Sequence, residues 1–252
     1  MTEFYGCRTI RELIPRQARA RPDAIALIHR ERRTTYGELE ARVMRVANGL
    51  LAMGLRPGDR IGYLGKNSDL YFELLFGAIA ANIVLAPVNW RLAPAEMTTL
   101  LQDAEAKVLF VGRGFAAIAA SLNLPALDRF VAMDEADCDW VQFEEWRDAQ
   151  PSNDPDVVAS PEDTVLQLYT SGTTGLPKGV ELTNTNLLSF IGCYESHDVV
   201  RLGPDDVALV CMPVFHLPAP VLDLCVWHRA PRPSCSKKAR SQILLMRSHD
   251  IR

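Results

Sequence analysis

The sequence has the length and composition of an ordinary globular protein. Its 252 residues are 48% hydrophobic and 23% charged, which is enough apolar material for one large α/β domain or two small ones. The formal net charge of −4 argues against a general nucleic-acid-binding protein, because such proteins need a basic surface for the phosphate backbone. The charge is uneven: residues 221–252 contain seven Lys or Arg against two Asp or Glu, a net charge of +5, which leaves −9 for residues 1–220.

The sequence also lacks the patterns typical of a membrane-spanning protein and of a zinc site. The first residues lack the basic and apolar pattern of a signal peptide, and the longest apolar stretch, residues 74–88, is interrupted by a glycine, an asparagine and a proline. No transmembrane segment is therefore expected. The six cysteines show no CxxC spacing, which predicts reduced thiols in a cytoplasmic protein and no zinc site.

Short apolar runs alternate with helical patterns through the first half of the chain. The sequence predicts helices at residues 9–21, 35–50, 68–81, 94–104 and 115–121, and strands at 24–29, 60–64, 83–88, 107–111, 129–133 and 164–169. The charged run at residues 30–33 is interpreted as a solvated turn. Residues 148–163, rich in proline and aspartate, are interpreted as an exposed connection. This alternation predicts an α/β fold with layered, mainly parallel sheets and helices on both faces.

The segment from Thr170 to Gly179 has a composition suited to phosphate binding. Its ten residues include four hydroxyls, three glycines and Lys178. Glycines let backbone N–H groups approach phosphate oxygens, hydroxyls donate further hydrogen bonds, and the lysine adds a positive charge. It is not a Walker A loop, because Pro177 stands where the second glycine would be. A flexible Ser/Thr/Gly turn without a ligand is the alternative.

This segment resembles a known signature. Residues 169–180, YTSGTTGLPKGV, are similar position by position to the signature loop of the adenylate-forming superfamily, which includes acyl-CoA synthetases, luciferases and adenylation domains of peptide synthetases. Supporting similarity lies at residues 35–39 (TYGEL), 58–61 (GDRI), 86–92 (APVNWRL) and 212–216 (MPVFH). The form NWRL most resembles the fatty and aryl acyl-CoA synthetase branch.

The resemblance implies an ATP-dependent acyl-CoA synthetase whose partner is a small fatty or aryl carboxylic acid. In this family the carboxylate attacks ATP with Mg²⁺ to give an acyl-adenylate and pyrophosphate, and the thiol of CoA then displaces AMP. It also implies that the β- and γ-phosphates of ATP are bound by Thr170, Ser171, Gly172, Thr173, Thr174, Gly175 and Lys178. His216 would lie near the acyl pocket, with a buried core histidine as the alternative. No protein ligand for a metal is expected.

The chain departs from the family pattern in two places. Asn184 stands where the family often has histidine and is expected to cap the following helix. The family's adenine, ribose and Mg²⁺ segments and its catalytic lysine would lie beyond His216, and we expect no complete catalytic set in this chain. Two functions therefore stay open: an incomplete N-terminal fragment of a ligase, and a catalytically inactive remnant such as a pseudogene product.

These observations divide the chain into three parts. Residues 1–163 are predicted to form an N-terminal α/β subdomain with the acidic linker at its end, and residues 164–217 the start of an ATP-binding subdomain with the phosphate loop. Residues 218–252 form an atypical basic tail that is rich in Arg, Pro and Cys, a poor composition for a core helix. A reading-frame error, a lineage-specific tail and an engineered end are the possible origins. Residues 241–252 again resemble a family helix.

Overall fold

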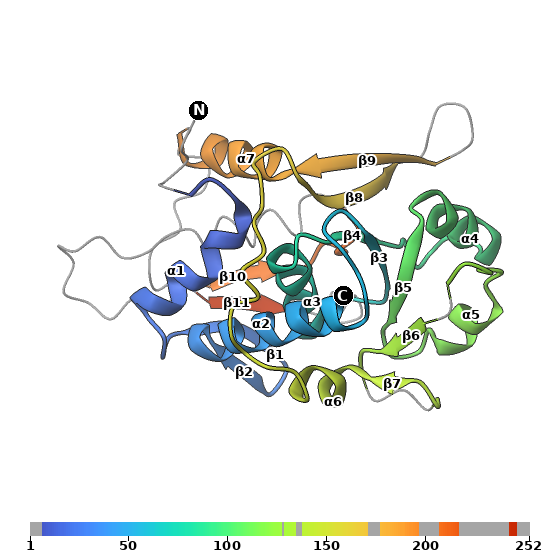
Figure 1. The fold of residues 1–252 in the computed structure, drawn as a ribbon, viewed down its shortest axis with the longest axis horizontal. Coiled ribbons are helices and arrows are strands. Elements are labelled where there is room, and N and C mark those ends of the chain that lie inside the picture. The colour runs from blue at the N-terminus through green and yellow to red at the C-terminus, as the bar shows by residue number, and fades with distance from the viewer. Residues whose placement is uncertain are drawn as a thin grey trace.

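The computed structural model describes residues 7–127, 129–134, 138–170, 177–196, 207–216 and 242–245, which form two sheets with intervening helices (Figure 1). A 3₁₀ turn at Ile10–Glu12 precedes the first α-helix. The helices are α1 (Leu13–Ala20), α2 (Tyr36–Ala52), α3 (Asp69–Ala80), α4 (Pro94–Asp103), α5 (Ala116–Ser121), α6 (Phe143–Asp148) and α7 (Asn184–Ser196). The strands are β1 (Ile25–His29), β2 (Arg32–Thr35), β3 (Arg60–Leu64), β4 (Val84–Pro87), β5 (Ala106–Val111), β6 (Arg129–Ala132), β7 (Val141–Gln142), β8 (Thr164–Thr170), β9 (Lys178–Thr183), β10 (Val207–Val210) and β11 (Gln242–Leu245).

The larger sheet has seven strands in the order β7-β6-β5-β3-β4-β8-β9. All neighbours are parallel except the antiparallel hairpin of β8 and β9. Strand β8 joins β4 through the pair Leu85 and Leu166, so the sheet continues across residue 163. The predicted α/β class with a mainly parallel sheet is confirmed, while the division at residue 163 does not coincide with a boundary between sheets and stays a prediction.

The smaller sheet has the order β10-β11-β1-β2, with β10, β11 and β1 parallel and β2 antiparallel to β1. Strand β11 supplies the pairing between β10 and β1. The expected helix at residues 241–252 is therefore wrong for residues 242–245, which are extended. Within the basic tail, residues 218–252, the structure describes only the four residues of this strand.

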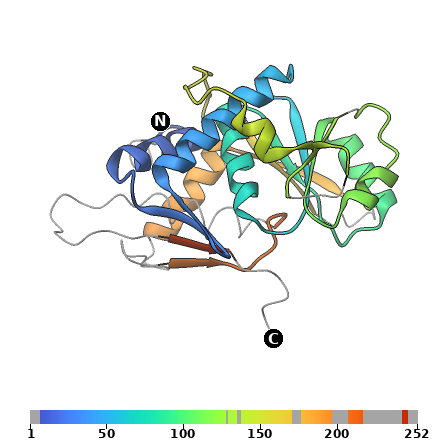
Figure 2. The ribbon, with the colours of Figure 1, turned by 90° about the horizontal axis from the view of Figure 1, so that it is seen from below.

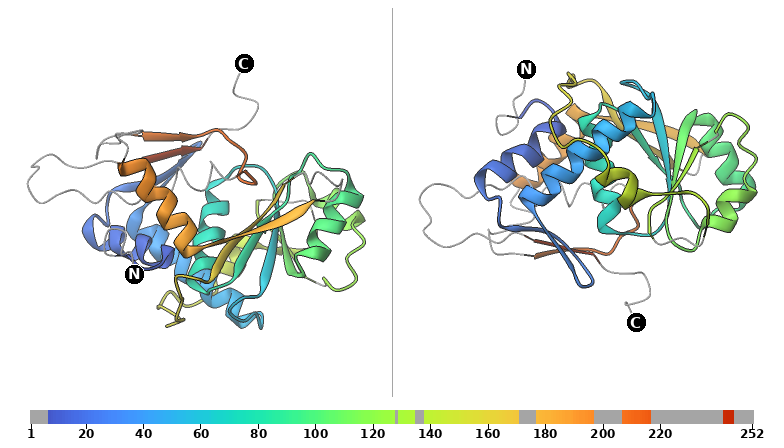
Figure 3. Two further views of the ribbon diagram at one scale, coloured as in Figure 1. Left: turned by 90° about the horizontal axis from the view of Figure 1, so that it is seen from above. Right: turned by 60° about the horizontal axis from the view of Figure 1, so that its bottom comes forward.

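Helices cover both faces of the larger sheet. Helices α3 and α7 lie between the two sheets (Figures 2 and 3), where α2, α3 and α7 contribute to one apolar core shared with β1 and β3. Every residue of α3 is buried, which explains why its sequence is apolar on all sides. A second core under α4 and α5 covers the opposite face of the sheet. The predicted helices on both faces are confirmed.

Two segments differ from the sequence predictions. The expected solvated turn at residues 30–33 is wrong in its second half, because β2 begins at Arg32 and pairs with β1. Strand β7 and helix α6 were not expected; α6 is short, and it is fixed by the packing of Phe143 and Trp146 on Phe110. Residues 149–163 contain no helix or strand and are largely exposed, as the composition predicts.

Asn184 has a different role from the predicted helix cap. It is the first residue of α7, it is buried, and its Oδ1 accepts a hydrogen bond from the backbone N–H of Ile10 (2.9 Å). Its Nδ2 donates to the carbonyl of Ser160 (3.0 Å). The capping bond comes from Thr183, whose hydroxyl accepts from the N–H of Asn186 (3.2 Å). The prediction for Asn184 is therefore wrong: the side chain joins the N-terminal segment to the connection before β8.

Within the described ranges, four cysteines are present as free thiols: Cys7, Cys138, Cys193 and Cys211. The part of the chain that the structure describes contains no helix with the length and apolar character needed to cross a bilayer.

Candidate phosphate-binding site

The predicted phosphate loop connects the two strands of a β-hairpin. Thr170 ends β8, Lys178 begins β9, and the two residues are cross-strand partners with exposed side chains. The structure therefore brings together the two ends of the predicted site. The predicted residues Ser171, Gly172, Thr173, Thr174 and Gly175 lie outside the described residues, and their role stays a prediction.

Polar side chains on one face of the hairpin form a continuous chain of hydrogen bonds. The Nε of Arg60 on β3 donates to Oε1 of Gln167 (3.1 Å), and Nε2 of Gln167 donates to Oη of Tyr169 (2.9 Å). The hydroxyl of Tyr169 donates to Oδ2 of Asp103 at the end of α4 (2.6 Å). Burial and the Asp103 carboxylate raise the pKa of Tyr169, so the hydroxyl keeps its proton at neutral pH.

The second strand of the hairpin is held by the same arginine. The Nη2 of Arg60 donates to Oε1 of Glu181 on β9 (2.5 Å), and Glu181 is the cross-strand partner of Gln167. Because side chains alternate along a strand, residues 167, 169, 179 and 181 share one face of the hairpin. Sequence reasoning missed this network. The signal in the sequence that could have revealed the network is Gln167, a polar residue within the apolar strand sequence VLQL.

Gly179 makes room for this network. A Cβ atom at residue 179 would lie 2.6 Å from Nε2 of Gln167 and 3.2 Å from Cζ of Tyr169. The absence of a side chain therefore allows Gln167 and Tyr169 to occupy the space opposite β9.

We expect Gly179→Ala to lower the free energy of unfolding by about 1 kcal/mol, because the new methyl group displaces Gln167 from its partly buried hydrogen bond to Tyr169. Urea denaturation measures this change. In a Gln167→Ala background the same substitution should cost less, because its steric partner is gone. Additive costs of the two substitutions would contradict the role assigned to Gly179.

His216 lies on a second segment, which is fixed by Asn67 after β3. Asn67 Nδ2 donates to the carbonyl of Met212 (2.8 Å), and its Oδ1 accepts from the N–H of Val214 (3.1 Å). The side chain of His216 is exposed, so it is not the buried core histidine considered as the alternative. Its ring lies against Phe215 (centroids 4.6 Å apart). No described contact joins it to Thr170 or Lys178.

An aromatic and cationic cluster surrounds this segment at the carboxyl ends of β3 and β4. Trp90 contacts Phe215 edge-on (6.4 Å between centroids), Arg91 stacks over Trp90 (4.6 Å), and Lys66 lies 5.5 Å from the same ring. Because β8 is parallel to β4, its loop leaves toward the same edge of the sheet, where open α/β sheets bind ligands. Sequence reasoning used the NWRL motif only for the family resemblance, so the positions of Trp90, Arg91 and Lys66 in this cluster were missed.

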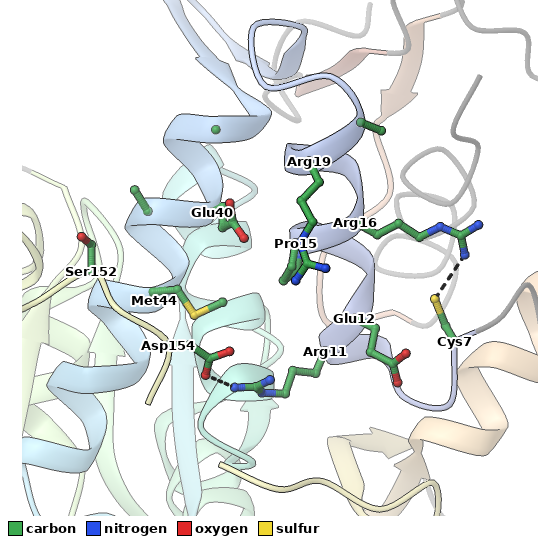
Figure 4. A pocket seen from close by; sticks show the side chains of 13 residues that line it. Cys7, Arg11, Glu12, Pro15, Arg16, Arg19, Glu40, Met44, Ser152 and Asp154 are labelled. Atoms are coloured by element: carbon green, nitrogen blue, oxygen red, sulfur yellow. Dashed lines mark hydrogen bonds and ion pairs between the residues drawn. The ribbon is translucent and has the colours of Figure 1, made fainter. Parts of the chain in front are cut away.

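A separate hollow lies away from the predicted site residues. It has a volume of about 930 Å³ and lies between α1, α2 and residues 152–154 (Figure 4). Arg11 and Asp154 form an ion pair there, and Arg19 and Glu40 line it from facing helices. It contains none of the predicted site residues. The described residues also bring together no three His, Cys, Asp or Glu side chains that could hold a metal ion.

Comparison with known proteins decides the family. Residues 14–229 match the model of the family described as AMP-binding enzyme. The chain belongs to the AMP-binding enzyme family. The match extends past the predicted boundary at residues 217 and 218. Within this family the chain is 37% identical over 205 residues to fatty acid–[acyl-carrier-protein] ligase ScoC of Streptomyces coeruleorubidus, covering 79% of this chain and 38% of that protein.

Two further AMP-binding relatives agree with this assignment. The chain is 39% identical over 204 residues to feruloyl-CoA synthase of an Amycolatopsis species, covering 81% of this chain and 39% of that protein. Its fold is similar to the inhibitor-bound N-terminal domain of FACL13 from Mycobacterium tuberculosis, with a TM-score of 0.83 at 25% identity over 95% of this chain and 57% of that chain. This chain spans less than half the length of the two curated ligases named above, 38% and 39%.

Proposed function

We propose that this chain is the N-terminal, phosphate-binding part of an ATP-dependent acyl-CoA synthetase that activates a fatty or aryl carboxylic acid. The observation that carries the proposal is the β8–β9 hairpin, which sets Thr170 opposite Lys178 at the two ends of a Gly- and Ser/Thr-rich loop. The relatives support the reaction class, since their names include a fatty acid–carrier-protein ligase and a feruloyl-CoA synthase.

In this function the chain acts by positioning and by electrostatics. Lys178 supplies a positive charge for the β- and γ-phosphates, the hydroxyl of Thr170 donates a hydrogen bond, and residues 171–175 add backbone N–H groups and hydroxyls. These groups stabilise the charge that moves onto pyrophosphate when the carboxylate attacks the α-phosphate. Mg²⁺ would arrive with ATP, and CoA would be the second substrate. His216 would face the acyl group.

A catalytically inactive remnant is the second candidate. We expect this chain alone to bind phosphate groups weakly and to catalyse no complete ligation.

Two measurements on the same chain separate these functions. Calorimetric titration with magnesium pyrophosphate tests the phosphate site, and ATP–pyrophosphate exchange with a panel of fatty and aryl acids tests adenylation. Binding without exchange supports the phosphate site and is expected of both functions. Exchange by this chain alone would contradict the inactive remnant, and an absence of binding would contradict the phosphate site.

We expect Lys178→Ala to weaken the binding of magnesium pyrophosphate about tenfold, because a hydrogen bond from a charged donor to phosphate contributes about 1.5 kcal/mol. Calorimetric titration measures the affinity. Lys107→Ala is the matched control, since it removes an exposed lysine that pairs with Asp59 away from the hairpin. Equal affinities of the Lys178 variant and the unmodified chain would exclude Lys178 from the site.

We also propose that a one-base shift of the reading frame near codon 218 produced the atypical tail, and that a second shift restores the frame before residues 241–252. The Arg- and Pro-rich composition of this segment supports the proposal. Sequencing of the coding DNA tests it: a single-base change near that codon should restore a glycine-rich apolar run, and its absence would exclude the frame shift.

A further inference from the structure

In the chain of hydrogen bonds that runs from Arg60 through Gln167 and Tyr169 to Asp103, each group donates to the next one. Arg60 can only donate and the Asp103 carboxylate can only accept, so the amide of Gln167 and the hydroxyl of Tyr169 are each held in one orientation between them. Charged groups at the ends of a hydrogen-bonded chain polarise the bonds between them. This arrangement fixes the position of Tyr169 more firmly than packing alone.

The place of Asp103 in its helix supports a specific role. Asp103 is the last residue of α4, where the partial negative charge of the helix end disfavours a carboxylate. The helix itself therefore gains nothing from an aspartate at this position. Its described partner is the hydroxyl of Tyr169, which comes from a strand 66 residues further along the chain.

The network reaches both ends of the predicted phosphate loop. Tyr169 directly precedes Thr170, and its cross-strand partner Gly179 directly follows Lys178. Arg60 contacts both strands, through Gln167 on β8 and Glu181 on β9. A shift of Tyr169 would therefore change the spacing of Thr170 and Lys178, the two ends of the predicted loop.

We propose that Tyr169 is a positioning residue for the phosphate loop and acts through its hydrogen bonds to Asp103 and Gln167. The proposal rests on the proposed phosphate-binding function. Tyr169 touches the loop through the backbone and needs no contact with the ligand. Its loss should weaken pyrophosphate binding about five- to tenfold, as expected for one hydrogen bond to a charged group that orders a binding loop.

The test compares three variants of the full chain in calorimetric titration with magnesium pyrophosphate and in thermal unfolding. Tyr169→Phe removes only the hydroxyl. Asp103→Asn keeps an oxygen that accepts from Tyr169, while Asp103→Ala removes the acceptor. Tyr36→Phe is the matched control, because its hydroxyl accepts a hydrogen bond from Arg21 in a buried site on α2.

We expect Tyr169→Phe and Asp103→Ala to bind pyrophosphate about five- to tenfold more weakly, with unfolding temperatures within a few degrees of the unmodified chain, and Asp103→Asn to bind nearly normally. Tyr36→Phe should lower the unfolding temperature without changing affinity. Unchanged affinity of Tyr169→Phe would overturn the positioning role and leave the phosphate site standing. An unmodified chain that binds no pyrophosphate would reject both.

Discussion

Replacing Glu73 with alanine is expected to lower the free energy of unfolding by about 3–5 kcal/mol, the range for removing one partner of a buried ion pair. Glu73 lies in the middle of α3 with none of its surface exposed. Its two oxygens accept from Nη1 of Arg42 (2.9 Å) and Nη1 of Arg147 (2.5 Å). Without the carboxylate, the buried guanidinium of Arg147 keeps only the half-exposed Asp148 and Glu144 as acidic partners.

Urea denaturation at neutral pH measures this effect. Glu73→Leu combined with Arg147→Met should recover much of the loss, because an apolar pair of similar volume avoids the cost of burying charges. Lys107→Ala, which breaks an exposed pair with Asp59, should cost less than about 1 kcal/mol. If Glu73→Ala costs no more than this exposed substitution, Glu73 does not hold α2, α3 and α6 together.

Acidification is expected to weaken the fold through Asp69. Burial raises the pKa of this carboxyl, but hydrogen bonds from His29 and Arg32 outweigh it and hold the pKa at about 2, below the ordinary value of 3.8. A depressed folded-state pKa contributes stability above the unfolded-state pKa, and that contribution is lost as the pH falls from about 4 toward 2. The side chain is 1% exposed, so the contribution at neutral pH is about 2 kcal/mol.

Asp69→Asn isolates this contribution. The variant should be about 2 kcal/mol less stable than the unmodified chain at pH 7, and the difference should shrink as the pH approaches 2. Urea denaturation of both proteins from pH 7 to pH 2.5 gives the difference directly, since the other titrating groups are common to both. A difference that stays constant across this range would show that the carboxylate charge is not what stabilises the β1–β2 hairpin on α3.

Most strands of the larger sheet could be predicted from the sequence, because the patterns that indicate them involve residues close together in the chain. Strands β3, β4 and β5 are short apolar runs between helices, and a parallel sheet buries such strands on both faces. Helix α2 has a capping box at Thr35 and Glu38, where the hydroxyl of Thr35 accepts from the N–H of Glu38. Each of these features depends on neighbours within a few residues.

The features that sequence reasoning missed depend on partners far along the chain. Strand β2 is polar, and its Arg32 is fixed by Asp69, 37 residues away. Asn184 was read from its neighbours as a cap, whereas its partner is Ile10, 174 residues away. Tyr169 belonged to a recognised motif, but its contact with Asp103 could only be seen in the fold. Residues 171–175 remain predicted from the motif alone.

The position of β11 has a consequence for the order in which the protein folds during synthesis. In the smaller sheet, β1 and β10 are both paired with β11, so strands from residues 25–29 and 207–210 meet only through residues 242–245. Contacts between such distant residues form slowly, because a long loop must close first. Until residues 242–245 have been synthesised and paired, β1 therefore has an unpaired edge, which is a surface that other unfinished chains or chaperones can bind.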